Sequence, residues 1–233
     1  PRPPFAPMRT GTSALLRSCT MSNAPAKLAA LRHLLAERFP VATRTRGRVL
    51  LTGVPALDEP AGGLPLGAIT EIVCAAPSCG GHLLLGQLLA ATRATRTRLA
   101  LVDGADSFDP GSHPADLLAH LVWVRCAGTP AALQAADLLA RDANLGLVVL
   151  DLRHAPAAEL RRIPGPQWYR LQRAVEPADL ALVVQTPRAA VPSAQLRFQL
   201  AVSHAATALD RERALLAAGL QPALQRQRLQ AAG

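Results

Sequence analysis

The stretch between residues 49 and 89 constrains the fold most strongly, because it places several short elements in a fixed order. An extended segment and a glycine-rich turn precede an apolar run at 69–74, which has the length of a buried strand. A loop of small residues at 75–81 follows, and then an apolar helix at 82–93. This order is typical of a phosphate-binding loop, in which backbone N–H groups at a helix N-terminus face a polyphosphate.

The loop lacks the residues that usually hold the phosphate and its metal ion. The pattern G-x-x-x-x-G-K followed by Ser or Thr aligns with residues 75–82, where Gly81 stands for the lysine and His82 for the hydroxyl. Of the two pattern glycines, the sequence keeps only Gly80. The candidate nucleotide loop is therefore degenerate, and its residues are Ala75, Pro77, Ser78, Gly80, Gly81 and His82.

The core continues as apolar strands that alternate with helices. Strands are expected at 69–74, 99–103, 121–126, 146–151, 180–185 and 196–202, and helices at 82–93, 130–142 and 167–176. This alternation predicts an α/β fold with a mostly parallel sheet that is covered on both faces. Ligands of such sheets bind beyond the carboxyl ends of the strands, where the loop 75–81, Asp103 and Asp151 should meet.

Matched positions before the loop point to a family. They are Thr52-Gly53, Leu57-Asp58, Gly62 to Pro65, Gly67 and Glu71-Ile72. This order resembles the run T-G-x-x-x-L-D…G-G-L-P-x-G-x-x-x-E-I that precedes the phosphate loop of the RecA recombinase family. The resemblance extends to about Ser203. It implies a RecA-like sandwich of the P-loop type.

The resemblance also assigns roles to positions beyond the loop. Asp151 ends a strand that resembles the Walker B strand, whose acid organises Mg²⁺, and the segment 103–110 resembles the family's D-A-E-H-A-L-D-P run. The catalytic glutamate of that run corresponds to Ala105, with Asp106 as a neighbouring substitute. Phosphoryl transfer depends on the missing lysine, hydroxyl and glutamate, so we expect a pseudo-ATPase with no catalytic residues. Binding of ATP and Mg²⁺ stays an alternative.

The two aspartates at the strand ends have a plainer interpretation. Without the lysine and hydroxyl, Asp103 and Asp151 are expected to be solvated strand-end carboxylates rather than metal ligands. Cys74, Cys79 and His82 lie close in sequence, but no second pair of cysteines completes a zinc set, so no metal site is expected. Reduced thiols are typical of a cytosolic protein.

Relatives with eroded nucleotide sites suggest a function. Among them the chain is most similar to the ImuA-type accessory proteins of the bacterial damage-induced mutagenesis complex. That resemblance implies a non-catalytic protein of the SOS response that links RecA to a Y-family polymerase-like protein in translesion synthesis. One alternative is an ATP-dependent RecA-type repair enzyme, and another is a SulA-like inhibitor of cell division.

Segments on both sides of the core at 49–206 are expected to contact partners. Residues 1–21 are interpreted as a disordered segment upstream of a natural start at Met21, and 22–48 as an amphipathic helix at 24–39 with a linker. The tail 207–233 is expected to be basic and helical, with one helix over 210–218 and a second opening at Pro222. Candidate partner-binding residues are Leu28, Leu31, Leu35, Phe39, Arg226 and Arg228.

The charge allows contact with DNA but does not prove it. A formal net charge of +9, nearly all from arginine, suits nucleic acid, although a high-arginine composition can also reflect the base composition of a genome. Trp168-Tyr169 near Arg161-Arg162 either stacks on single strands or packs on the sheet, and packing is favoured. We expect weak, non-specific DNA binding, a cytoplasmic and nucleoid-associated location, and no membrane span.

Overall fold

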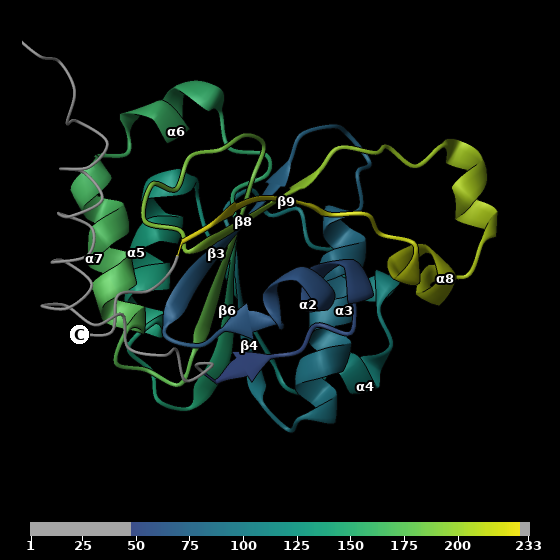
Figure 1. Ribbon diagram of the computed structural model, residues 1–233, viewed down its shortest axis with the longest axis horizontal. Coiled ribbons are helices and arrows are strands. Elements are labelled where there is room, and N and C mark those ends of the chain that lie inside the picture. The colour runs from purple at the N-terminus through teal and green to yellow at the C-terminus, as the bar shows by residue number, and fades with distance from the viewer. Residues whose placement is uncertain (1–47, 229–233) are drawn as a thin grey trace, which may run out of the picture. The chain divides into compact units, whose positions relative to one another are not determined.

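A seven-stranded sheet forms the centre of the molecule in the computed structural model, which describes residues 48–228. The strand order is β5-β4-β6-β7-β3-β8-β9, and all pairs are parallel except that of β8 with β9 (Figure 1). The strands are β3 (Ala68–Cys74), β4 (Arg98–Asp103), β5 (Leu121–Arg125), β6 (Leu145–Asp151), β7 (Ala181–Thr186), β8 (Leu196–Leu200) and β9 (Ala223–Gln227). The prediction of an α/β fold with a mostly parallel sheet is confirmed.

Helices cover both faces of this sheet, as predicted. They are α2 (Pro55–Ala61), α3 (Gly81–Ala94), α4 (Ala115–Leu118), α5 (Thr129–Leu139), α6 (Ala157–Arg162), α7 (Gly165–Val175) and α8 (Arg213–Ala218). In Figure 1, α2 and α3 lie on one side of the sheet and α5 and α7 on the other. Short 3₁₀ turns at Pro110–Ser112 and Ala206–Asp210, and a two-stranded ladder of β1 (Val49–Leu50) and β2 (Leu64–Pro65), complete the elements.

The apolar residues of α3 fix this helix against the sheet. Leu84, Leu85, Leu88 and Leu89 are all at most 1 % exposed, and they belong to the core cluster on that face of the sheet. Burying each leucine contributes roughly 1.5–3 kcal/mol relative to leaving it in water. The N-terminus of α3 is thereby held at the carboxyl end of β3, beside the degenerate loop.

The motif before β3 has a structural explanation. The Asp58 carboxylate accepts hydrogen bonds from the Thr52 and Gly53 backbone N–H groups and from the Thr52 hydroxyl, at 2.9–3.1 Å. Gly67 has φ +70°, and a Cβ there would lie 2.9 Å from the Glu176 carbonyl oxygen. The matched residues thus close a turn and permit a close backbone approach.

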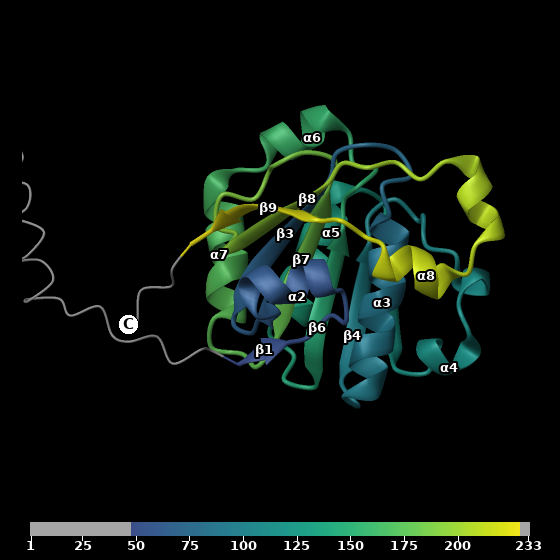
Figure 2. The ribbon, with the colours of Figure 1, turned by 45° about the vertical axis from the view of Figure 1, so that its right-hand side comes forward.

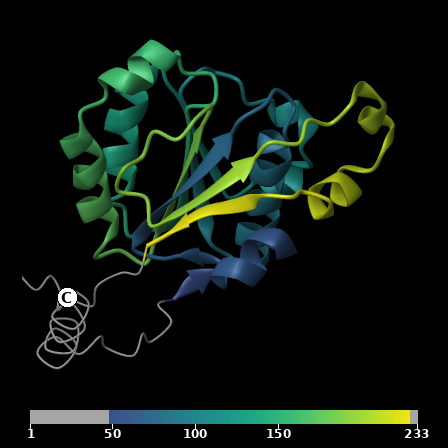
Figure 3. The ribbon, with the colours of Figure 1, turned by 45° about the horizontal axis from the view of Figure 1, so that its top comes forward.

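The tail differs from the prediction. The helix expected from Pro222 is wrong, since residues 223–227 form β9, antiparallel to β8 (Figure 3). This pairing gives hydrogen-bond partners to backbone groups of β8 that would otherwise lie unpaired at the edge of the sheet. Such a long-range gain cannot be seen in the helix propensity of residues 223–227. The expected helix at 210–218 is shortened to α8, which packs against α3 (Figure 2).

Several predicted segments lie outside the described residues. These are the segment 1–21, the helix 24–39 with Leu28, Leu31, Leu35 and Phe39, and the last residues 229–233. Within residues 48–228, no helix is both long enough and apolar enough to cross a membrane.

Candidate functional site

The carboxyl edge of the sheet brings the predicted site residues together. The loop between β3 and α3 lies there, and Asp103 and Asp151 are paired in register at the ends of the neighbouring strands β4 and β6. A cavity of about 990 Å³ opens over the loop. Its lining includes Cys74, all residues of the loop 75–81, His82, Arg153, His154 and His204.

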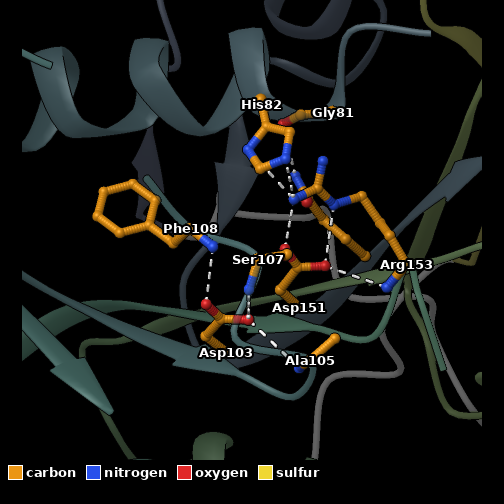
Figure 4. Close-up of polar contacts among 9 residues, drawn as sticks. Gly81, His82, Asp103, Ala105, Ser107, Phe108, Asp151 and Arg153 are labelled. Atoms are coloured by element: carbon orange, nitrogen blue, oxygen red, sulfur yellow. Dashed lines mark hydrogen bonds and ion pairs between the residues drawn. The ribbon is translucent and has the colours of Figure 1, made fainter. Parts of the chain in front are cut away.

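Arg153 fills the centre of this site (Figure 4). Its backbone N–H and its Nε donate to Asp151 Oδ1 at 3.0 and 2.9 Å, and its Nη2 donates to Oδ2. The same Nη2 lies 3.3–3.4 Å from the ring nitrogens of His82. The two charged side chains are only 8 % and 3 % exposed. Asp151 is therefore neutralised by a residue two positions further along the chain.

The pKa shifts follow this geometry. Burial alone would raise the pKa of Asp151, but the Arg153 hydrogen bonds and charge outweigh it and hold the pKa below the usual range. Burial would lower the pKa of Arg153, yet Asp151 raises it. Burial and the Arg153 charge lower the pKa of His82 to about 4, so its ring is neutral at pH 7.

Gly81 and Arg153 fit each other sterically. A Cβ at Gly81 would lie 2.8 Å from both Cδ and Nη1 of Arg153, and 3.0 Å from Cys74 Sγ. A lysine at this position would therefore require Arg153 to move. The Gly81 carbonyl also accepts from Gln185 Nε2 at 3.2 Å, while Gln185 Oε1 is buried with no hydrogen-bond partner among the described residues.

The Asp103 carboxylate is hydrogen-bonded by the loop that follows it in the chain. It accepts the backbone N–H groups of Ala105, Ser107 and Phe108 at 2.9–3.3 Å, and the residue is fully buried (Figure 4). The prediction that Asp103 and Asp151 are solvated is wrong, because N–H donors and a guanidinium replace water around them. Within residues 48–228, no group of three or more His, Cys, Asp or Glu is arranged to hold a metal ion.

The position that corresponds to the catalytic glutamate of the RecA family holds no acidic residue. Ala105 stands there, and the neighbouring Asp106 pairs with Arg125 on the surface, with its Oδ1 2.6 Å from Arg125 Nε. Asp106 is not among the residues that line the cavity. Its substitution for the glutamate has no support in this geometry.

Glu71 has a role that sequence reasoning missed. Its Oε1 accepts from the Thr186 hydroxyl at 3.0 Å and from the Ala190 and Val191 N–H groups at 2.6 and 3.1 Å. Its Oε2 accepts from Arg197 Nε at 2.5 Å. This fully buried carboxylate therefore fastens the loop after β7. A charged residue in the middle of an apolar strand was the available signal.

A second hollow lies at the loop that Glu71 fastens. Its volume is about 560 Å³, and its lining includes Arg161, Arg188, Arg197 and Arg226. Trp168 also lines it but is only 1 % exposed and belongs to the core, which confirms that it packs on the sheet. Tyr169 is 48 % exposed. Arg226 donates weakly to the Pro192 carbonyl at 3.4 Å, and Arg228 is exposed at the end of the described chain.

Comparisons with known proteins do not assign the chain to a family. It matches no protein-family model, and a search of curated proteins finds no significant match.

Proposed function

We propose that this chain is a RecA-like accessory protein of the ImuA type, which does not hydrolyse ATP and which links RecA to a Y-family polymerase-like protein in the bacterial DNA-damage response. The observation that carries the first part is the Asp151–Arg153 ion pair beneath His82. The remaining parts rest on the sequence resemblance. The proposal places the protein with DNA in the bacterial cytoplasm.

The ion pair supports the loss of hydrolysis through charge. Phosphoryl transfer needs a cation at the β/γ-phosphates, a bound Mg²⁺ and a group that positions water. Here the Asp151 carboxylate is already bound by Arg153, so a Mg²⁺ ion would have to displace a buried guanidinium. The Asp103 carboxylate likewise accepts hydrogen bonds from three backbone N–H groups. Neither aspartate is free to organise a metal.

The steric fit of Gly81 supports the same conclusion. The absence of a side chain at Gly81 and the inward position of Arg153 fit together, since the Arg153 side chain occupies the space that a side chain at position 81 would need. Restoring the lysine alone would create a clash and a second buried cation. The degenerate loop is therefore a stable arrangement of its own, with its charges compensated internally.

The arginine hollow supports weak contact with phosphates. Four arginines line this hollow at one edge of the sheet. One of them, Arg197, is paired with Glu71, and the other three are Arg161, Arg188 and Arg226. Contacts of this kind are independent of sequence and weaken steeply as salt rises. The loop between β7 and β8 is short, and its backbone is fastened to Glu71. Tight, specific DNA binding is not expected from this surface.

The linking function is tested by substitution rather than by deletion. Removing residues 207–233 would remove β9 from the sheet, so loss of binding would not be informative. We would instead compare the full chain with a Leu31→Asp/Leu35→Asp variant and with Arg228→Glu in pull-downs with RecA and with the polymerase-like protein. Arg173→Glu, which changes an exposed residue of α7, is the matched control.

The expected results separate the two partners. The helix variant should lose RecA and keep the polymerase-like protein, and Arg228→Glu should do the reverse. If the unchanged protein binds neither partner, or if both variants bind both partners as the control does, the proposed linking function or its assignment to these residues is wrong.

A further inference from the structure

A strap of the chain covers the degenerate loop, a feature that the proposed function does not use. The strap is residues 201–222, which leave β8, form a 3₁₀ turn and α8, and return as β9 (Figure 2). The Ser203 hydroxyl donates to the Pro77 carbonyl at 2.7 Å, and the His204 backbone N–H donates to the Ser78 carbonyl at 3.0 Å. The strap residues that line the cavity are His204, Ala205, Ala206, Ala208 and Leu216. The strap therefore forms one wall of the 990 Å³ cavity.

The one pattern glycine that the loop keeps, Gly80, fits this strap. Its φ is +94°, a conformation that favours glycine, and a Cβ there would lie 2.3 Å from Leu220 Cδ2. In the strap, Ala217, Leu220 and Pro222 are buried, whereas most of the other residues are exposed. The strap is thus held by few buried contacts, which is typical of a segment that opens while the rest of the fold stays intact.

A contact between a histidine and an arginine holds α8 in place. Arg213, the first residue of α8, has its Nη1 3.3 and 3.4 Å from the ring nitrogens of His113. The His113 residue is 8 % exposed, and its ring stacks on Phe108 with the ring centroids 5.3 Å apart. A Cβ at Gly86 of α3 would lie 3.1 Å from His113 Cε1. The imidazole is therefore enclosed by α3, by Phe108 and by the arginine of the strap.

We propose that the His113–Arg213 contact is a pH-sensitive latch, and that protonation of His113 releases the strap from the degenerate loop. A neutral imidazole can accept a hydrogen bond from the guanidinium, whereas an imidazolium would place two positive charges within 3.4 Å of each other. Among the described residues, the other titratable groups that act on the charge of His113 are Asp109, before the 3₁₀ turn at Pro110–Ser112, and His82 of α3. The Asp109 carboxylate favours the imidazolium, and His82 is neutral at pH 7.

The closed strap favours the neutral ring. Burial and then the charge of Arg213 lower the pKa of His113, and together they outweigh the opposite effect of Asp109. Opening of the strap hydrates the ring and removes Arg213, so the pKa returns toward its ordinary value of about 6.5. Opening therefore takes up a proton below about pH 6.5, and the open population rises by up to about tenfold for each pH unit below that value.

The test is hydrogen–deuterium exchange of the full-length protein at pH 7 and pH 5.5, read by mass spectrometry and corrected for the intrinsic pH dependence of amide exchange. Peptides that cover α8 should lose several-fold protection at pH 5.5, while peptides from α7 keep theirs. His113→Phe keeps an aromatic ring on Phe108 but binds no proton, so it should remove this pH dependence. Arg213→Gln should reduce it, because no cation then opposes the protonated ring. His204→Gln changes a strap histidine on the cavity wall and is the matched control, which should exchange as the unchanged protein does.

The outcomes decide between a latch and other causes of exchange. The proposal is overturned if α8 is equally protected at both pH values, or if a folded His113→Phe variant keeps the pH dependence. It is also overturned if α3 loses protection to the same extent as α8, since that result would mean unfolding of the whole domain rather than release of the strap. None of these outcomes depends on nucleotide hydrolysis or on RecA, so failure of the latch would leave the proposed function standing.

Discussion

Two buried carboxylate–arginine pairs belong to the central sheet, and they differ in what they hold together: Glu71 lies midway along β3, whereas Asp151 ends β6. Glu71 accepts donors from β7, from the following loop and from Arg197 on β8, so it joins three segments. Among the described residues, the Asp151 carboxylate accepts only from Arg153, through the backbone N–H and the guanidinium. The first pair joins segments far apart in the chain, whereas the second joins residues two positions apart, and its arginine lines the cavity over the degenerate loop. Buried charge therefore fastens a loop in one place and lies at the candidate functional site in the other.

The largest effect is expected from breaking the Glu71 pair. Glu71→Gln should cost about 3–5 kcal/mol of unfolding free energy, because Arg197 loses its carboxylate in a buried position. Urea unfolding at pH 7 measures this, with Glu59→Gln on the exposed surface as the control. Equal stability of the two variants would mean that Glu71 does not fasten the loop.

The Asp151 pair should be removable without a large loss. Arg153→Leu alone should cost about 3 kcal/mol, the low end for breaking a buried pair, because the Asp151 carboxylate keeps its hydrogen bond from the backbone N–H of residue 153. Asp151→Leu/Arg153→Leu should recover most of that loss, since the side chains of the pair reach another described segment by a hydrogen bond only at His82, over 3.3–3.4 Å. The corresponding double variant of Glu71 and Arg197 should not recover. If both double variants recover stability equally in urea unfolding, the Glu71 and Asp151 pairs do not differ in the way described.

Acid should weaken the Asp151 pair before it affects the apolar core. The folded pKa of Asp151 lies below that of the unfolded chain, which is about 3.9, so its contribution is present above about pH 4 and is lost as the pH falls through the folded pKa. Asp151→Asn should therefore show a shallower fall in stability below pH 4. The exposed Asp210→Asn is the control, and identical acid slopes for Asp151→Asn and the unchanged protein would contradict the assignment.

The smallest effect is expected at the arginine hollow. Arg161→Ala should weaken binding to single-stranded DNA modestly and reduce the slope of log K against log salt by about one. Fluorescence anisotropy at several salt concentrations measures it, with Arg173→Ala on α7 as the control. Tight binding that persists at high salt would contradict weak phosphate contact as the only mode.

The strands of the sheet were predictable because they are continuous apolar runs. The glycine turns between elements were predictable because their residue types are visible in the local sequence. The tail was not, since β9 forms by pairing with β8 rather than from its own periodicity. The loop 75–81, Asp103 and Asp151 lie at the carboxyl edge of the sheet, as the sequence predicted. The groups that bind the two carboxylates were not predicted. The spacing of Asp151 and Arg153 was visible in the sequence, but the space beside Gly81 that admits the arginine side chain was not.

The central claim is that the internal ion pair replaces a metal and a nucleotide, and ATP turnover tests it most directly. Purified protein with Mg²⁺, with and without single-stranded DNA, should release phosphate at the background rate. Gly81→Lys should do the same, because the new side chain meets Arg153 and no acid stands at Ala105. Turnover above background in the unchanged protein that disappears in Asp151→Ala would contradict the account.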